Sequence, residues 1–383
     1  MQVKQVYTLL NDVIRETLGE SAVVNEDLSG VVELGESVFN ANAMDKYVKS
    51  LVNHIGRVIF VNRKYRGGAP SVLMDGWEFG SVLEKISGDL PDAQENESWE
   101  LSDGAVYEQD VFYQPKVEAK FFNKLVTFEI PMSFTEKQVK QSFSNAEQLN
   151  AFLSMLYNEI EKAMTVNIDN LIMRTINSMI YETVKDEYGT GVHTGASGVR
   201  AVNLLYEYNQ ANGTSLTVTQ AIQTPEFIRF ASLKMKLVAD RLAKISRVYN
   251  VGGKARFTPR EDLHIVLLSE FDASASVYLQ SDTFHDELVK LPQAETVAYW
   301  QGSGTGYALA DTSKVDITKD GVNIVTSGIV GIMFDRDALG VCNRDRRVTT
   351  HYNAKAEFYN NYYKFDAEFF NDLNENFVVF FME

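Results

Sequence analysis

The sequence predicts an α+β fold in an elongated subunit, and three observations carry that prediction. Residues 145–184 keep apolar side chains at helical spacing, and neither Gly nor Pro interrupts them. Residues 123–132 alternate apolar and polar side chains, as a half-buried β-strand does. Residues 356–383 contain ten Phe or Tyr side chains and end in an apolar run, unlike a solvated tail. We therefore expect one very long helix, extended strands, and a C-terminus that is packed into the fold.

The predicted helix is long enough to set the shape of the subunit. Asn145 and Gln148 form a capping box at its start. At 1.5 Å per residue the helix spans roughly 60 Å, whereas a globule of this chain length has a radius of gyration of about 21 Å. This favours a flat subunit, and a kink in the middle of the helix is the alternative. The expected buried face consists of Leu149, Phe152, Leu153, Leu156, Ile160, Ala163, Met164, Ile168, Leu171, Ile172, Ile176, Met179 and Ile180.

Composition restricts the class of protein. A chain of 383 residues exceeds one typical domain, and 45% hydrophobic residues indicate a folded protein. The single cysteine, Cys342, excludes an intrachain disulfide and favours a reducing compartment. The sequence contains no signal peptide and no apolar run long enough to cross a membrane. A net charge of −16 argues against a protein whose main task is to grip nucleic acid.

The sequence predicts that the N-terminal third forms an arm followed by extended chain. Residues 3–18 and 44–55 have short amphipathic helical patterns and look like an arm rather than a core. In the strand at residues 123–132 the apolar side chains share one face, and residues 105–122 are expected to form its antiparallel partner. The polar, acidic residues 74–104 show one short helix at most. Loops of this length are usually functional, so we expect something outside the subunit to support this one.

Residues 189–344 mix helices and strands. We expect strands at 264–271, 295–302 and 328–339 and a short helix at 281–291. Another helix begins at Thr224-Pro225-Glu226, because proline is well suited to a first helical turn. The side chains that we expect this helix to bury are Phe227, Phe230, Leu233, Leu237, Val238 and Leu242.

The residues do not form a pattern typical of an enzyme. The five histidines are scattered, and His264 in an apolar strand is read as a core residue rather than a ligand. The glycine-rich residues 302–306 lack a phosphate-loop lysine, and Ser197 lacks the spacing of a nucleophile elbow. Nearby arginines could activate Cys342, but a buried structural thiol is favoured. We therefore predict no catalytic, cofactor or metal site.

The order of these elements resembles the major capsid proteins of tailed bacteriophages, which have the HK97-like fold. Within that family the chain is most similar to the capsid proteins of small short-tailed (podovirus-type) phages. The resemblance lies in element order and diffuse pattern over nearly the whole chain, rather than in one motif. The stretches that carry it are residues 50–61, 145–173, 261–284 and 351–381.

The resemblance implies a domain organisation and a function. The domains would be an N-terminal arm (1–56), an extended loop (57–132), a peripheral domain with a spine helix (133–188), an axial domain (189–344) and C-terminal strands returning to the peripheral domain (345–383). The protein would not be an enzyme, and it would self-assemble into an icosahedral shell around double-stranded DNA. An encapsulin-type nanocompartment shell is the alternative with the same fold, and an enzyme that uses residues 189–344 is the alternative from another class.

The resemblance also implies partners and contacts. The chain would form hexamers and pentamers with itself, use a separate scaffolding protein and a portal protein, and touch DNA only by non-specific proximity. It would be found in the virion after assembly in the host bacterial cytoplasm, without a membrane. We expect the extended loop to contact a neighbouring subunit, although its rings could instead pack on their own axial domain. The residues concerned are Phe112, Tyr113, Lys116, Lys120, Phe121 and Phe122.

Overall fold

A computed structural model gives the fold of the chain, and its described residues divide into two compact units. Unit 1 contains the described residues of Met1–Gly76, Leu125–Ile172 and Val341–Glu368, and unit 2 contains those of Trp77–Lys124, Met173–Gly340 and Phe369–Glu383. The structure describes residues 72–74, 83–135 with gaps at 92, 94–99, 107–109 and 111, and then 146–189, 195–280, 294–301 and 308–383.

Several expectations lie outside the described residues. These are the two helices of the N-terminal arm, the capping box at Asn145, the short helix at 281–291 and the glycine-rich residues 302–306.

Unit 1 is built on a four-stranded sheet with the order β1-β11-β12-β4. Strand β4 pairs antiparallel with β12, from Leu125 opposite Glu368 to Thr135 opposite Phe358. Within β4 the side chains of Val126, Phe128, Ile130 and Met132 are half-buried, whereas Thr127 and Glu129 are exposed, which confirms the predicted alternation. The strands are β1 (Leu73–Met74), β4 (Leu125–Thr135), β11 (Leu339–Asn353) and β12 (Phe358–Asn371).

The predicted partner of β4 is wrong. Residues 117–122 form β3, which pairs with β2 rather than with β4. Only Asn123 and Lys124 separate β3 from β4, and neither supplies the glycine that a tight two-residue hairpin favours. The C-terminal strand β12 offers β4 a long apolar face instead, where the rings of Phe128 and Phe365 stack 5.0 Å apart.

The long helix is confirmed. Helix α5 (Ala146–Tyr188) runs for 43 residues without a break, which at 1.5 Å per residue is roughly 64 Å. It contributes residues to both units. From Glu159 onward, where its side chains are described, one face is buried as the periodicity predicts. The buried apolar residues of this face include Ile160, Met164, Ile168, Leu171, Ile172, Ile176, Met179 and Ile180.

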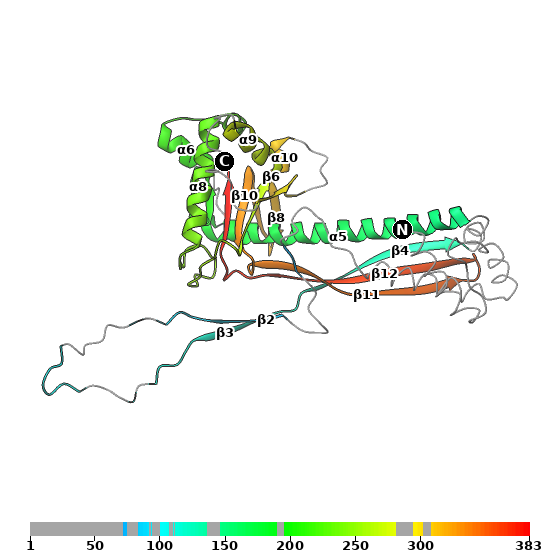
Figure 1. The fold of residues 1–383 in the computed structure, drawn as a ribbon, viewed down its shortest axis with the longest axis horizontal. Coiled ribbons are helices and arrows are strands. Elements are labelled where there is room, and N and C mark those ends of the chain that lie inside the picture. The colour runs from blue at the N-terminus through cyan, green and yellow to red at the C-terminus, as the bar shows by residue number, and fades with distance from the viewer. Residues whose placement is uncertain are drawn as a thin grey trace. The chain divides into compact units, whose positions relative to one another are not determined.

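Unit 2 is built on a five-stranded sheet with the order β5-β13-β10-β6-β7 (Figure 1). Strand β10 is antiparallel to both β13 and β6, and β7 and β5 are parallel to their neighbours. The strands are β5 (Ala201–Asn203), β6 (Leu263–Leu268), β7 (Ala294–Val297), β10 (Ile329–Asp335) and β13 (Phe377–Phe381). A separate ribbon joins β8 (Val315–Lys319) to β9 (Val322–Thr326).

Among the described residues of unit 2, five helices accompany the sheet in addition to the end of α5, and one of them corrects a prediction. Helix α8 buries Phe227, Val238 and Leu242 as expected, but Leu233 and Leu237 are 58% and 42% exposed. The buried face is completed instead by Ile228, Ala231, Ser232, Met235 and Ala239. The helices are α6 (Leu204–Asn212), α7 (Val218–Ile222), α8 (Pro225–Leu242), α9 (Ser269–Gln280) and α10 (Leu309–Thr312).

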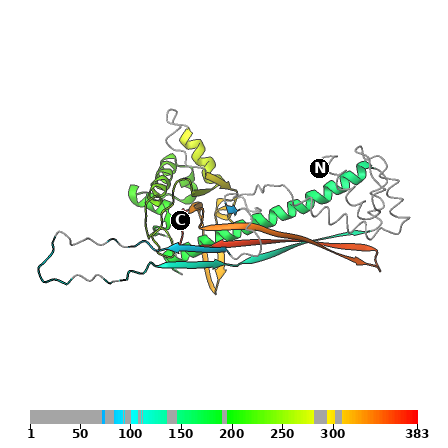
Figure 2. The ribbon, with the colours of Figure 1, turned by 60° about the horizontal axis from the view of Figure 1, so that its bottom comes forward.

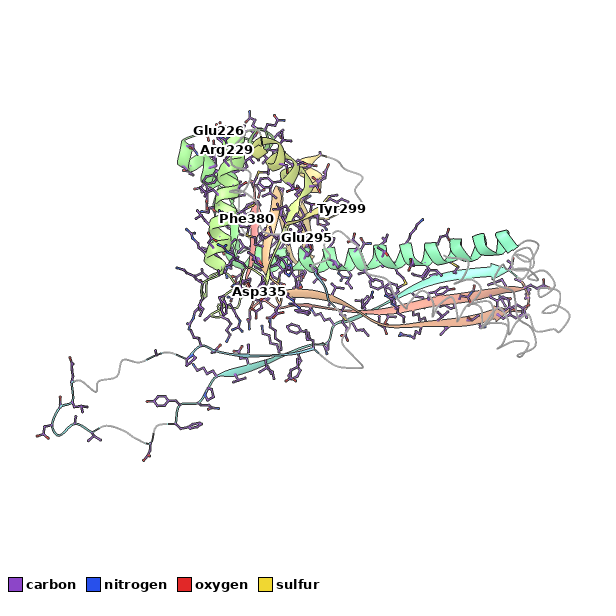
Figure 3. All side chains as sticks on the ribbon, viewed as in Figure 1. Glu226, Arg229, Glu295, Tyr299, Asp335 and Phe380 are labelled. Carbon is purple, nitrogen blue, oxygen red and sulfur yellow. The ribbon has the colours of Figure 1, made fainter. Side chains whose placement is uncertain are left out.

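The last strand, β13, is fully buried within unit 2. All five residues of β13 are at most 1% exposed, and Phe380 of this strand is labelled in Figure 3. This strand pairs with β10 and β5, so it differs from the expectation that residues 345–383 all return to the peripheral domain. The approach of the chain end to Gly328 is close, because a Cβ there would lie 2.0 Å from the carbonyl oxygen of Met382.

Candidate functional site

The candidate site is the antiparallel hairpin formed by β2 (Leu83–Gly88) and β3 (Val117–Phe122) in unit 2. Figures 1 and 2 show these strands extending away from the five-stranded sheet. The sequence analysis placed no strand at β2, because six residues with mixed polarity give a weak signal. The pleat divides the hairpin into two faces.

The outer face of the hairpin is apolar and exposed. Its cross-strand pairs are Glu84 with Phe121, Ile86 with Ala119, and Gly88 with Val117. Ile86, Val117 and Phe121 are 64%, 61% and 63% exposed. Exposed apolar side chains that gather on one face of a ribbon can mark an interaction site.

The inner face of the hairpin contacts its own unit. The ring of Phe122 lies 5.2 Å from the ring of Phe370, at an interplanar angle of 45°. On the same face Lys85 and Lys120 stand opposite each other in the ladder. Both lysines form ion pairs with Asp372, which follows β12. Like charges directly opposite each other would repel, so the shared carboxylate stabilises this pair.

The six residues that the sequence analysis assigned to an inter-subunit contact fall into two groups in the structure, four exposed and two half-buried. Phe112 and Tyr113 are 83% and 74% exposed, and they join Phe121 as accessible rings. Lys116 is also exposed. Contact with a neighbouring subunit stays a prediction for these four residues.

The other two predicted contact residues, Lys120 and Phe122, are half-buried against their own unit. The alternative in the sequence analysis was that the rings pack on their own axial domain, residues 189–344. Phe122 does pack within its own unit, but its partner Phe370 and the Lys120 partner Asp372 lie in residues 345–383. Lys120 and Phe122 hold the hairpin in place.

Sequence reasoning missed the carboxylates that receive these lysines. Asp372 and Glu375 lie in the turn between β12 and β13, where they are 2% and 7% exposed. The signal was present, because the polar stretch of residues 371–376 interrupts an aromatic C-terminus that is otherwise predicted to be buried. Buried charges of this kind are almost always paired.

Other classes of site have little support within the described part of the chain. No group of three or more His, Cys, Asp or Glu side chains there could hold a metal ion. None of the described helices has the length and apolar character needed to cross a membrane. Cys342 is buried, as predicted, and its Sγ lies 3.4 Å from the carbonyl oxygen of Asn343. His264 is half-buried, its ring stacks on Phe334 at 5.6 Å, and burial lowers its pKa. The predicted packing is therefore found, but Nε2 is buried without a hydrogen-bond partner among the described residues, so this is not the fully satisfied core histidine that we expected.

Sequence comparison decides the family. The Phi29-like phage major capsid proteins match residues 10–381, which is nearly the whole chain. The chain belongs to this family. It is therefore a major capsid protein, a structural subunit of an icosahedral phage shell and part of the virion. A search of curated protein sequences finds no match.

The capsid protein shares its fold with solved phage structures. A chain in the capsid structure of Staphylococcus phage Andhra is 9% identical, with a TM-score of 0.50, and the match covers 84% of the capsid protein and 86% of that chain. A chain in the structure of the head fiber and inner core protein gp22 of native bacteriophage P68 is 8% identical, with a TM-score of 0.54, and the match covers 85% and 86%.

These similarities confirm the predicted fold class. The capsid protein has the α+β, HK97-like fold, with its hairpin loop, long helix and mixed α/β sheet domain. Nothing in the comparisons supports the encapsulin-type alternative.

Proposed function

We propose that the outer face of the β2–β3 hairpin lies on a neighbouring copy of the capsid protein in the assembled shell. The observation that carries this proposal is the contrast between the two faces of one ribbon. The inner face is held by ion pairs and by the Phe122–Phe370 contact. The outer face leaves Ile86, Val117 and Phe121 more than 60% exposed. A shell subunit would bury these apolar side chains at the interface, with charged groups such as Lys116 at its rim.

The energetic effect of such a contact would be multiplied by symmetry. Burying a phenylalanine side chain contributes on the order of 2 to 3 kcal/mol. In hexamers and pentamers every subunit offers one hairpin and receives another, because ring contacts are heterologous. A loss that a single folded subunit tolerates would therefore be repeated at every contact in the shell.

The remaining parts of the assembly follow from the family resemblance and the charge. We propose that a separate scaffolding protein and a portal protein act in assembly in the host bacterial cytoplasm, without a membrane, and that the phage is short-tailed. The shell would enclose double-stranded DNA and perform no catalysis. A net charge of −16 would keep the phosphate backbone from binding tightly to the wall. The division into arm, extended loop, peripheral domain, axial domain and C-terminal strands is part of the same proposal, except that β13 belongs to the five-stranded sheet.

Substitution of one outer-face ring tests the assembly contact. The variant Phe121→Ala should remain folded, with an unchanged far-UV spectrum, but should form few or no shells in negative-stain micrographs of chain co-expressed with its scaffolding protein. Phe257→Ala is the matched control, since this ring is also in unit 2 and is 52% exposed. Shells of normal size and yield from Phe121→Ala would contradict the proposal, as would equal loss in the control.

A further inference from the structure

The turn between β12 and β13 is a preformed socket for positive charge. Its buried polar residues include Asp372, Asn374 and Glu375. The socket holds its own shape, because the backbone N–H of Asn374 donates to Asp372 Oδ1 at 3.0 Å and the N–H of Glu375 donates to the Asp372 carbonyl oxygen at 3.2 Å. Gly252 fits closely against it, since a Cβ there would lie 2.0 Å from Asn374 Oδ1.

Two lysines of the hairpin enter this socket. Lys85 Nζ lies 3.0 Å from Asp372 Oδ2 and 2.7 Å from Glu375 Oε1, and it also donates to the carbonyl oxygen of Asp337 at 3.1 Å. Lys120 Nζ lies 2.9 Å from Asp372 Oδ1. One lysine comes from each strand, so the socket holds the ribbon at two points. Charge-assisted bonds of this kind are stronger than neutral ones.

A third lysine forms ion pairs in which the positive charge lies on the sheet side and the carboxylates lie on the hairpin side. Lys254, from the sheet domain, places its Nζ 3.1 Å from Asp89 Oδ1 and 2.7 Å from Glu118 Oε1, both of which belong to the hairpin side. Arg256 Nε lies 3.2 Å from Glu375 Oε1 and stays on the sheet side. Glu375 therefore keeps a positive partner even when the hairpin lysines leave.

The apolar contribution to this contact is small. None of the described residues between Leu83 and Lys124 is buried. The aromatic contact between this segment and the rest of unit 2 is that of Phe122 with Phe370. The core of unit 2 consists of residues from its five-stranded sheet and helices. Separation of the hairpin would therefore expose little apolar surface, and the sheet behind it would keep its packing.

We propose that Asp372 and Glu375, together with Lys85, Lys120 and Lys254, form an ionic latch. The latch fixes the direction of the hairpin and opens while the rest of unit 2 stays folded. Asp372 and Glu375 are positioning residues that act through the two hairpin lysines. This inference rests on the proposed function, because the direction of the hairpin matters when its outer face must meet a neighbouring copy.

A distance measurement on the full chain tests the latch. Spin labels at Val117→Cys and Leu233→Cys use two exposed positions of unit 2, and the buried Cys342 takes no label. Labelled chain is diluted into unlabelled chain, so that distances within one subunit dominate. We expect one narrow distance in this background. Lys85→Met with Lys120→Met should replace it by a broad distribution, and Lys85→Arg with Lys120→Arg should restore the narrow one.

The control removes two lysines from the other ribbon of unit 2. Lys314 and Lys319 make exposed ion pairs with Asp316 and Glu182, so Lys314→Met with Lys319→Met gives the same change in charge and should keep the narrow distance. A narrow distance in the Lys85 and Lys120 methionine variant would overturn the latch. Loss of the folded sheet in that variant, seen by far-UV circular dichroism, would also overturn it. A latch seen in the labelled chain, together with failure of the unsubstituted, unlabelled chain to form shells, would contradict the proposed function alone.

Discussion

Phe121 and Phe122 are adjacent in β3 but face opposite environments. The ring of Phe121 is 63% exposed on the outer face of the hairpin, whereas the ring of Phe122 lies 5.2 Å from that of Phe370. The alternation of a β-strand places one aromatic side chain where a neighbouring copy can reach it and the other where it anchors the ribbon. We therefore expect Phe121 to act in assembly and Phe122 to anchor the hairpin.

Phe122→Ala should weaken the anchoring of the hairpin. Removal of a half-buried ring that makes one aromatic contact should lower the free energy of unfolding of unit 2 by about 1 to 2 kcal/mol. Phe121→Ala should change it by less than about 0.5 kcal/mol, because exposed substitutions cost little. Urea titrations followed by circular dichroism measure both values. Equal destabilisation by the two variants would show that the assignment of faces is wrong.

The buried face of α5 predicts a strong effect of charge. Ile176 is 0% exposed, so Ile176→Asp would bury an unpaired carboxylate and should destabilise the protein by about 4 kcal/mol or more, which prevents soluble folding. Val166→Asp is the control, because Val166 lies on the same helix and is 57% exposed. Soluble yield and circular dichroism distinguish the two variants. Normal folding of Ile176→Asp would contradict the assigned face.

Substitution of Gly328 by alanine should cause a steric clash in addition to backbone strain. Gly328 has a φ of +68°, and a Cβ there would lie 2.0 Å from the carbonyl oxygen of Met382. Gly328→Ala should therefore cost about 2 to 4 kcal/mol. Gly253 has a φ of +63° but open space around it, so Gly253→Ala should cost about 1 kcal/mol. Thermal unfolding compares them, and equal costs would rule out the contact with the C-terminal strand.

The pKa values of the two latch carboxylates, Asp372 and Glu375, are shifted in opposite directions. Burial raises the pKa of Asp372, but the bond from Lys120 and the charge of Lys85 outweigh burial and bring its pKa below the usual 3.8. The attachment that Asp372 supplies is thus complete above pH 3.8 and is lost as the pH falls through the lowered pKa. Burial raises the pKa of Glu375 above 4.5, more than Lys85 and Arg256 lower it, so protonation of Glu375 relieves a cost.

We therefore expect the hairpin to stay attached between pH 5 and 7 and to detach only below the ordinary carboxyl pKa of 3.8. The other charged groups that face this turn are Lys254, Glu118, Asp89, Asp337 and Asp335, and burial raises the pKa of Asp335. The spin-label distance followed from pH 7 to 3.5 measures attachment, and Asp372→Asn should remove the acidic step. Detachment near pH 5.5 in the unmodified chain would contradict this assignment.

Local periodicity explains how much of the fold the sequence predicts. Helix α5 was predictable because residues such as Ile168 and Ile176 recur on one face over many turns. The face of α8 was only partly predictable, because Leu233 and Leu237 form a second apolar row and the sequence alone does not say which row packs against neighbouring elements. Strand β13 was predictable as a buried segment from its apolar run.

Contacts between distant parts of the chain were not predictable. Lys120 and Asp372 are 252 residues apart, and neither residue carries a local signal of the other. The pairing of β4 with β12 is likewise long-range, and proximity along the chain favoured the wrong partner. The apolar rings of the hairpin were visible in the sequence, but their assignment to two faces required the register of β2 and β3.

The central claim is that the outer face of the hairpin contacts a second copy of the capsid protein. Cryo-electron microscopy of shells assembled from the unmodified chain tests it most directly, because side-chain density shows what covers each hairpin. We predict that a neighbouring copy buries Ile86, Val117 and Phe121, which are 64%, 61% and 63% exposed in the single chain. Shells in which these three side chains remain open to solvent, or are covered only by their own subunit, would contradict the claim.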